Sequence, residues 1–407
     1  MFTTRRNFLK SSSLVALGLT VPKFVSRTAW AAPTAEKAGA KDSILVVIQL
    51  TGGNDGLNTV VPFKDPEYAK LRTTLRLPDD KIKKLNDEVA LHPSMEGLAG
   101  LLQDRALTVV QGVGYPNPNQ SHFRSMDIWQ AASTQEHLTE GWLGKALKQT
   151  PAVGTYHLAE NNEIAPLALA GSPVRAPSIT SLEDFQLKMT ASSGADKRAQ
   201  KEIIEGVAKA QSGQPSLLDF VQRTATNTYA SSERLMNIGK NYQPKSTYPN
   251  TPLASRLKLA AQLIDADIGA RIFYVSLENF DTHANQLNNH ANLLSQLSEA
   301  MTAFYKDMAG RGHKDRVLTM TFSEFGRRAH ENGSKGTDHG SAAPMILVGG
   351  KVKAGVIGKH PSLTDLDQDN LKHHTDFRQV YATVLDQWLG VSSKEVLGQE
   401  FKLIELF

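Results

Sequence analysis

The stretch "SILVVIQLTGGNDGLNTVVP", residues 43–62, joins a continuous apolar run to a glycine-rich polar loop. The run Ser43–Leu50 does not alternate polar and apolar side chains, which is typical of a strand covered on both faces. The glycines that follow allow a tight turn and a close approach to a ligand, and Asp55 lies among them. Asp55 either binds a cation or forms an Asx-turn with its own backbone. The stretch therefore predicts a buried strand with a polar loop at its carboxyl end.

Similar apolar runs recur along the chain and alternate with helical patterns. We expect further strands at 106–115, 165–171, 270–280, 316–326 and 344–350. The segments 285–312 and 376–390 carry apolar residues at three- and four-residue steps, which predicts amphipathic helices. Alternating strands and helices predict an α/β three-layer sandwich, in which a mostly parallel sheet has helices on both faces.

One segment departs from this alternation. Residues 195–250 are polar and rich in Lys, Gln, Ala and Asn, and the pattern is helical for much of their length. We interpret them as a helical insertion or cap over the sheet, within a single domain that covers residues 32–407.

The first 31 residues have the pattern of an export signal. Arg5 and Arg6 precede a short apolar run, and small residues around Ala31 suit a signal peptidase. A transmembrane anchor is the alternative, but the run is far shorter than the ~20 residues that span a bilayer. We therefore expect a twin-arginine signal peptide at 1–31, the twin-arginine translocation machinery as a partner, and a periplasmic or secreted protein without a transmembrane anchor.

The composition excludes several kinds of site. The chain has no cysteine, so it has no disulfide, thiolate metal site, iron–sulfur cluster or cysteine nucleophile. The net charge is only +4, and no basic stripe interleaved with aromatic residues is present, which argues against nucleic-acid binding.

The loops after strands are the candidate site, because ligands gather at the carboxyl ends of parallel strands. Ser121 stands after the second long strand, where a helix begins. It is either a helix N-cap or a nucleophile favoured by the positive end of the helix. His122 and Arg124 are alternatives for a role in the site, and Arg124 is suited to clamp the oxygens of an anionic substrate.

The loop "DTHANQ" places an acid and an imidazole side by side. Asp281 and His283 alternate across one residue, so both side chains can leave the same side of the backbone and bind a cation. The alternative is that Asp281 caps the next helix. His290, further along that helix, is expected at the surface.

The stretch "FSEFGRRAHENGSKGTDHGSAAPMILVGG", residues 322–350, carries three more candidates between two strands: Glu324, Asp338 and His339. If the loops share one edge of the sheet, their acids repel one another unless a divalent cation neutralises them. The expected cation ligands are Asp55, Asp281, His283, Glu324, Asp338 and His339, with zinc, manganese, magnesium or calcium as the ion. Arg327 and Asn54 are the expected substrate-binding residues.

The motifs "GGNDGLNTVVP", "SHFRSMDIWQ", "DTHANQ", "FSEFGRR" and "TDHGSAAPMILVGG" resemble those of the exported DUF1501 proteins. That family is in turn similar to the alkaline phosphatase and sulfatase superfamily, which hydrolyses phosphate or sulfate esters with a hydroxyl-type nucleophile and one or two divalent cations. The resemblance implies an alkaline phosphatase-like fold, and it implies the nucleophile position for Ser121.

The resemblance also implies metal-binding positions for Asp55, Asp281, His283 and His339. Glu324 stands where the superfamily usually has an Asp-His pair, so one expected histidine is missing. The leading interpretation is a periplasmic metal-dependent hydrolase of phosphate or sulfate esters, which acts on a small anionic ester. The alternative is a non-catalytic exported protein that binds a metal or ligand on the same scaffold. A redox enzyme is a third interpretation, but this chain lacks the thiol ligands and the nucleotide-binding loop that such an enzyme would need.

Overall fold

The computed structural model of the chain describes residues 42–150, 154–160, 163–182, 239 and 241–407. The expected signal peptide at 1–31 lies outside these residues, as does most of the expected insertion at 195–250. Within the described ranges, no helix combines the length and apolar character needed to cross a membrane.

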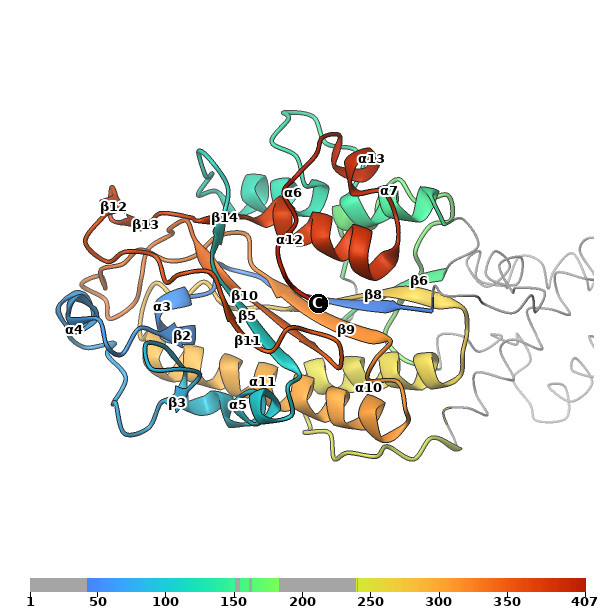
Figure 1. Cartoon of the computed structure of the whole chain (residues 1–407), viewed down its shortest axis with the longest axis horizontal. Coiled ribbons are helices and arrows are strands. Elements are labelled where there is room, and N and C mark those ends of the chain that lie inside the picture. Colours follow the sequence, from blue (N-terminus) through green and yellow to red (C-terminus); the bar gives the residue numbers. More distant parts are fainter. Residues whose placement is uncertain (1–41, 151–153, 161–162, 183–238, 240) are drawn as a thin grey trace, which may run out of the picture.

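A nine-stranded sheet forms the centre of the molecule (Figure 1). Its path runs β11-β5-β10-β9-β1-β8-β6-β7, and β14 pairs with β5. The strands are β1 (Ile44–Leu50), β5 (Leu107–Gly114), β6 (Gly154–Leu158), β7 (Ser178–Ile179), β8 (Ala270–Leu277), β9 (Val317–Phe322), β10 (Ala343–Gly349), β11 (Gly355–Ile357) and β14 (Thr375–Asp376).

The sheet is mostly parallel, with one reversed strand. In the register of the central strands, Val47 of β1 lies beside Tyr274 of β8 and Met320 of β9, and both pairings are parallel. Only β10 runs antiparallel to its neighbours β5 and β9 among the strands described. The carboxyl ends of β1, β5, β8 and β9 therefore share one edge with the amino end of β10.

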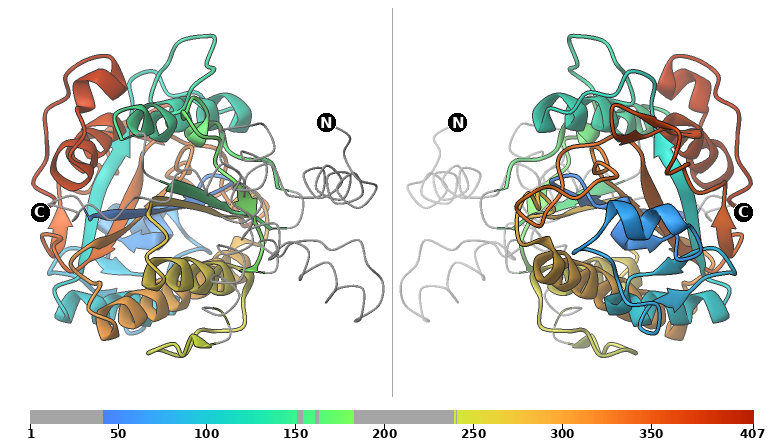
Figure 2. Two further views of the ribbon diagram at one scale, coloured as in Figure 1. Left: turned by 90° about the vertical axis from the view of Figure 1, so that its right-hand side faces the viewer. Right: turned by 90° about the vertical axis from the view of Figure 1, so that its left-hand side faces the viewer.

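Helices cover both faces, as Figures 1 and 2 show. One layer contains α5 (Glu96–Gln103), α10 (Pro252–Asp265) and α11 (Gln286–Gly310). The other contains α6 (His122–Ala131), α7 (Trp142–Lys148), α12 (Phe377–Thr383) and α13 (Ser393–Leu397). The predicted three-layer α/β sandwich is confirmed.

The continuous apolar run of β1 follows from this double cover. Val46 and Ile48 point into the core shared with α11, where they lie in one cluster with Leu294. Leu45 and Val47 point to the opposite face and join the cluster that contains Trp142. Both sets of side chains are fully buried, so neither face of the strand offers a place for polar residues.

Smaller elements lie toward the end of the molecule where β1 leads into α3 (Figures 1 and 2). They are a three-stranded sheet of β2 (Val60–Val61), β4 (Ala90–Leu91) and β3 (Lys83–Lys84), a pair of β12 (Leu366–Asp367) and β13 (Asn370–Leu371), and the helices α3 (Gly56–Thr59) and α4 (Pro66–Leu71). The helix expected at 376–390 is α12 followed by a π-helical segment at Val384–Leu389.

The strand expected at 165–171 is wrong. This segment forms a short 3₁₀ turn, Leu167–Leu169, and the strand of this region is β6 instead. Its apolar side chains serve another contact: Ala168 and Leu169 are buried in the cluster that contains Trp142 of α7. The run is therefore apolar because it packs under a helix, and periodicity alone does not separate this case from a buried strand.

The glycines after β1 allow another loop of the protein, and not a ligand, to pack closely against the backbone. Gly52 and Gly53 have φ angles of 118° and 80°, a conformation that favours glycine. A Cβ atom at Gly52 would lie 2.3 Å from the backbone nitrogen of Asp281. Gly52 thus lets the loop after β1 touch the loop after β8.

We expect Gly52→Ala to lower the free energy of unfolding by ~2–3 kcal/mol, because the added carbon meets backbone atoms at an unfavourable φ. Urea denaturation measures this loss. Gly100→Ala is the matched control: Gly100 is exposed in α5, and a Cβ there meets no atom within 4 Å. This control should stabilise by about 0.5–1 kcal/mol, since alanine is the better helix former. Equal effects of the two changes would contradict the close-approach argument.

Candidate metal centre

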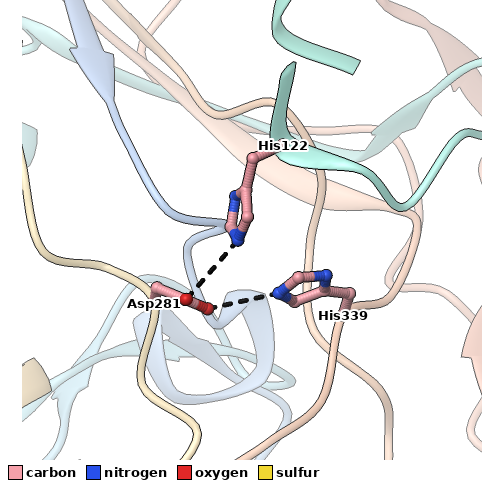
Figure 3. Close-up of side chains that lie close together, drawn as sticks. All are labelled: His122, Asp281 and His339. Atoms are coloured by element: carbon pink, nitrogen blue, oxygen red, sulfur yellow. Dashed lines mark hydrogen bonds and ion pairs between the residues drawn. The ribbon is translucent and has the colours of Figure 1, made fainter. Parts of the chain in front are cut away.

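Three side chains from distant segments meet at the shared edge of the sheet (Figure 3). His122 is the first residue of α6, which follows β5; Asp281 follows β8; His339 precedes β10. One ligand atom from each lies within 4.8 Å of the other two. The group therefore has the size of a cation-binding site.

Asp281 is the centre of this group. Its Oδ2 lies 3.4 Å from Nε2 of His122, and its Oδ1 lies 3.2 Å from Nε2 of His339. His283 joins from the same loop, with its Nε2 3.1 Å from Oδ1 of Asp281 and 3.0 Å from Nε2 of His339. The carboxylate of Asp281 thus lies within 3.4 Å of three imidazole nitrogens.

The other nitrogen of each imidazole is held by an oxygen. Nδ1 of His122 lies 2.9 Å from Oε1 of Glu324. Nδ1 of His283 lies 3.2 Å from Oδ1 of Asp338, and Nδ1 of His339 lies 2.8 Å from the carbonyl oxygen of Gln120. Carboxylate and carbonyl oxygens only accept hydrogen bonds, so a proton on Nδ1 of each neutral ring satisfies these three contacts. In this tautomer each ring presents a lone pair on Nε2.

These lone pairs need a partner. Neutral Nε2 atoms of His283 and His339 at 3.0 Å cannot both be satisfied by each other. Nε2 of His122 is buried and has no hydrogen-bond partner among the residues described. Imidazoles whose far nitrogen is bound to a carboxylate or carbonyl are the usual arrangement of histidine metal ligands. The donor set therefore fits a divalent cation.

The pKa shifts of Asp281 and His339 favour the protonation states that cation ligands need. Burial raises the pKa of Asp281, but the hydrogen bond and charge of Arg327 lower it more, to about 2, so this carboxylate stays ionised. Burial lowers the pKa of His339, which favours the neutral ring that a cation requires. The hydrogen bond to Glu324 raises the pKa of His122, so in this imidazole a proton competes with a cation.

Glu324 and Asp338, both expected as ligands, lie behind the histidines. The side chain of Glu324 is fully buried, and its Oε1 also accepts from the backbone nitrogen of Gly52 at 2.8 Å. Asp338 accepts from the side-chain nitrogen of Asn332 at 3.1 Å as well as from His283. These contacts favour an orienting role for the two acids over direct ligation.

Asp55, the first expected ligand, lies outside the group. Both of its oxygens are bound by Arg72, with Nη1 2.6 Å from Oδ2 and Nη2 2.9 Å from Oδ1, and both side chains are fully buried. It also accepts from the backbone nitrogen of Leu57 and the side chain of Gln286. Burial raises the pKa of Asp55, but Arg72 lowers it more, so the carboxylate stays charged. These contacts favour a structural role.

The expected substrate-binding residues are also engaged within the protein. The guanidinium of Arg327 is fully buried and binds the carbonyl oxygens of Gly53 and Thr337, in addition to Asp281. Oδ1 of Asn54 accepts from Nε2 of His290 at 2.9 Å. Arg327 thus fixes Asp281 to the neighbouring loops, and these contacts favour a positioning role for it.

The surface position expected for His290 is wrong. Its side chain is 1% exposed, because α11 turns it toward the sheet edge, where it binds Asn54. Its ring lies 6.0 Å from that of the buried His92, measured between centroids.

Ser121 and Arg124 both lie at the start of α6. Ser121 is exposed at the N-cap position, but its hydroxyl does not cap the helix. The residues before and after it in the sequence take part in the group: the carbonyl oxygen of Gln120 binds His339, and the ring of His122 binds Glu324. Arg124 instead binds backbone carbonyl oxygens of the following loop, including that of Thr134 at 2.8 Å.

From the sequence, His122 was only an alternative to Ser121, and neither Arg72 nor Gln286 was predicted. A signal for His122 was present, because it starts a helix directly after a strand that ends at the site edge. No sequence signal marks Arg72 as the partner of Asp55, since the pairing depends on how residues 56–72 fold back.

Fold and site define an α/β sandwich protein with a histidine and aspartate centre at the carboxyl edge of its sheet. The chain belongs to the family described as "Protein of unknown function (DUF1501)", whose model matches residues 42–404. The resemblance found in the sequence motifs is thereby confirmed. No curated protein matches the chain in sequence.

Several solved structures are similar to the chain in overall arrangement. The C-terminal periplasmic domain of EcEptC from Escherichia coli, in complex with zinc, has a TM-score of 0.39 and 11% identity, over 78% of this chain and 75% of that one. The PsFucS1 sulfatase from Pseudoalteromonas sp. has a TM-score of 0.38 and 11% identity, over 97% and 74%. A protein in the alkaline phosphatase superfamily from Vibrio parahaemolyticus has a TM-score of 0.38 and 8% identity, over 93% of this chain and 77% of that one.

The buried pair His92 and His290 should make the fold sensitive to acid. Burial lowers the pKa of His92 to about 4 and that of His290 to about 3, below the ordinary 6.5. The unfolded chain therefore binds protons that the folded chain does not, and stability falls as the pH drops from 6.5 toward 4. At pH 5 we expect a loss of about 2 kcal/mol for each histidine.

Urea denaturation at pH 7 and pH 5, with a chelator present, measures this loss. His290→Gln keeps a donor for Asn54 and should remove about half of the loss assigned to the pair. His137→Gln, which changes an exposed histidine in the loop after α6, is the matched control and should leave the pH dependence unchanged. An unaltered pH dependence in His290→Gln would refute the assignment.

Proposed function

We propose that the protein is an exported metal-dependent hydrolase of phosphate or sulfate esters, with a divalent cation held by His122, Asp281, His283 and His339. The observation that carries the proposal is the orientation of the three imidazoles. Each has Nδ1 bound to an oxygen and Nε2 turned toward Asp281. Histidines held in this way are built to ligate, and a solvated loop would not need three such supports.

The donor set favours zinc among the cations considered. Three imidazole nitrogens and one carboxylate match the nitrogen and oxygen ligands of tetrahedral zinc sites, whereas magnesium and calcium prefer oxygen ligands. When bound, the ion would supply a positive charge that polarises a phosphoryl or sulfuryl oxygen.

Ser121 is the proposed nucleophile. It is exposed, and the contacts of Gln120 and His122 fix its position beside the centre. The amino end of α6 adds free N–H groups and a partial positive charge, which favour an anionic ester. The oxygen of the hydroxyl would bond to the phosphorus or sulfur atom as the ester bond breaks, and the alcohol would leave with the hydroxyl proton. Water would then cleave the new bond, release phosphate or sulfate and return a proton to Ser121.

Export by the twin-arginine route is part of the proposal and rests on Arg5, Arg6 and the short apolar run after them. This route carries folded proteins, so a chain that folds around a cation can take up the cation before export.

A second candidate function is favoured by the arginines. The guanidinium of Arg327 is fully buried and bound by backbone carbonyl oxygens and Asp281, and that of Arg124 donates to backbone carbonyl oxygens such as that of Thr134. This observation supports a non-catalytic exported protein that binds a cation or ligand at the same centre.

We expect the purified protein to bind about one zinc ion per chain, measured by elemental analysis and by competition with a chelating dye. His339→Ala should weaken the affinity by at least about 100-fold, since even the outer partners of metal ligands contribute ~10–100-fold. His137→Ala, in an exposed loop, should bind zinc as the wild type does. Equal affinities in His339→Ala and the wild type would rule out this centre.

We expect turnover of a chromogenic phosphate or sulfate ester by the zinc-loaded protein. Ser121→Ala should lower kcat by at least about 1000-fold, because the nucleophile is removed. Ser295→Ala, on the exposed face of α11, is the matched control and should keep full activity. Zinc bound with no turnover of any ester would instead establish the non-catalytic function.

A further inference from the structure

Two loops carry most of the proposed ligands, and they come from different strands. The loop after β8 contains Asp281 and His283, and Thr282 lies between them. The loop before β10 contains His339, and Thr337 stands two residues earlier. Thr282 and Thr337 are buried, at 4% and 0% exposed, although their neighbours face the centre. The two threonines therefore point to the inner side of the loops.

One buried amide joins both loops. Gln286 is the first residue of α11 and is 0% exposed. Its Oε1 accepts from the hydroxyl of Thr282 at 3.0 Å and from the hydroxyl of Thr337 at 2.6 Å. Each loop carries a ligand next to its threonine or two residues away. The carbonyl oxygen of Gln286 therefore adds a side-chain link between the loops to the backbone bond from the nitrogen of Thr337 to the oxygen of Thr282.

The orientation of this amide is fixed from the other side. Nε2 of Gln286 donates to Oδ2 of Asp55, a carboxylate that only accepts. A flipped amide would place two oxygens against each other there and would leave the threonine hydroxyls facing an NH₂ group. Arg72 keeps Asp55 ionised and in place, with both side chains fully buried. The charged pair therefore decides which way the amide of Gln286 points.

We propose that Gln286 is a positioning residue of the metal centre, and that the buried pair Asp55–Arg72 acts through it. The amide holds Asp281 and His283 at a fixed distance from His339, so the ligands are spaced before the cation arrives. Preorganised ligands bind a cation more tightly because less ordering is needed on binding. This inference rests on the proposed cation centre, and it assigns a new role to Asp55 in place of ligation.

The test is the zinc affinity of the full chain, with urea denaturation of the metal-free form measured in parallel. Gln286→Met keeps the volume but removes both hydrogen-bonding ends, and it should weaken zinc binding by ~10–100-fold, as loss of other supports behind metal ligands does. Cobalt substitution adds a spectroscopic readout, since the visible absorption band of bound cobalt should change with altered ligand geometry.

Gln130→Met is the matched control. Gln130 is also a buried glutamine, 6% exposed, with hydrogen bonds to Gln49 and Tyr274, but it contacts neither ligand loop. We expect it to lower stability while leaving zinc affinity and the cobalt spectrum unchanged. Equal weakening of zinc binding by both variants would overturn the proposal, because the effect would then follow general stability.

Thr337→Val and Thr337→Ser provide a second arm in case Gln286→Met does not fold. The valine removes the hydroxyl bonded to Gln286 and should weaken zinc binding, whereas the serine keeps it and should restore the affinity. Wild-type affinity in Thr337→Val would also overturn the role of Gln286. A wild-type chain that binds no zinc would refute the proposed function itself, which is a different outcome from unchanged affinity in the variants.

Discussion

The site depends on the hydrogen bonds at the Nδ1 atoms of three histidines. Glu324, Asp338 and the carbonyl of Gln120 each accept one of these bonds, and each comes from a different part of the sheet edge. Without them the rings would rotate freely, and their Nε2 atoms would have no common direction. The bonds hold the ring planes and turn the Nε2 atoms toward Asp281, which is the arrangement that the proposed cation centre requires.

A buried polar layer beneath the loops complements these bonds. Asp55, Arg72 and Gln286 occupy positions where a protein core is usually apolar, and burying a charged pair costs desolvation that its mutual attraction only partly offsets. Such groups are better explained by specificity than by stability: they define one arrangement of the loops above them. In this chain, Asp55 binds Arg72 and accepts a hydrogen bond from Gln286, which contacts the two loops that carry Asp281 and His339.

Much of the architecture could be predicted from the sequence, because continuous apolar runs reveal strands buried on both faces. The site was harder to predict. Residues before a parallel strand belong to the opposite edge of the sheet, so His339 reaches the centre only because β10 runs antiparallel. No local sequence pattern indicates that β10 runs antiparallel. The surface position expected for His290 was wrong for a related reason: its partner Asn54 is 236 positions away in sequence, and a polar residue looks exposed until its partner is known.

The hydrogen bonds that hold the imidazoles join residues that are far apart in the sequence, and this affects how the site forms. His122 and Glu324 are 202 positions apart, and Gln120 and His339 are 219 apart. An unfolded chain therefore lacks the hydrogen bonds that hold the imidazoles, since forming them requires long loops to close. A cation that binds only the finished arrangement raises the apparent melting temperature with its free concentration. For the proposed cation centre, the metal concentration in the compartment of folding would thus shift the folded fraction of the chain.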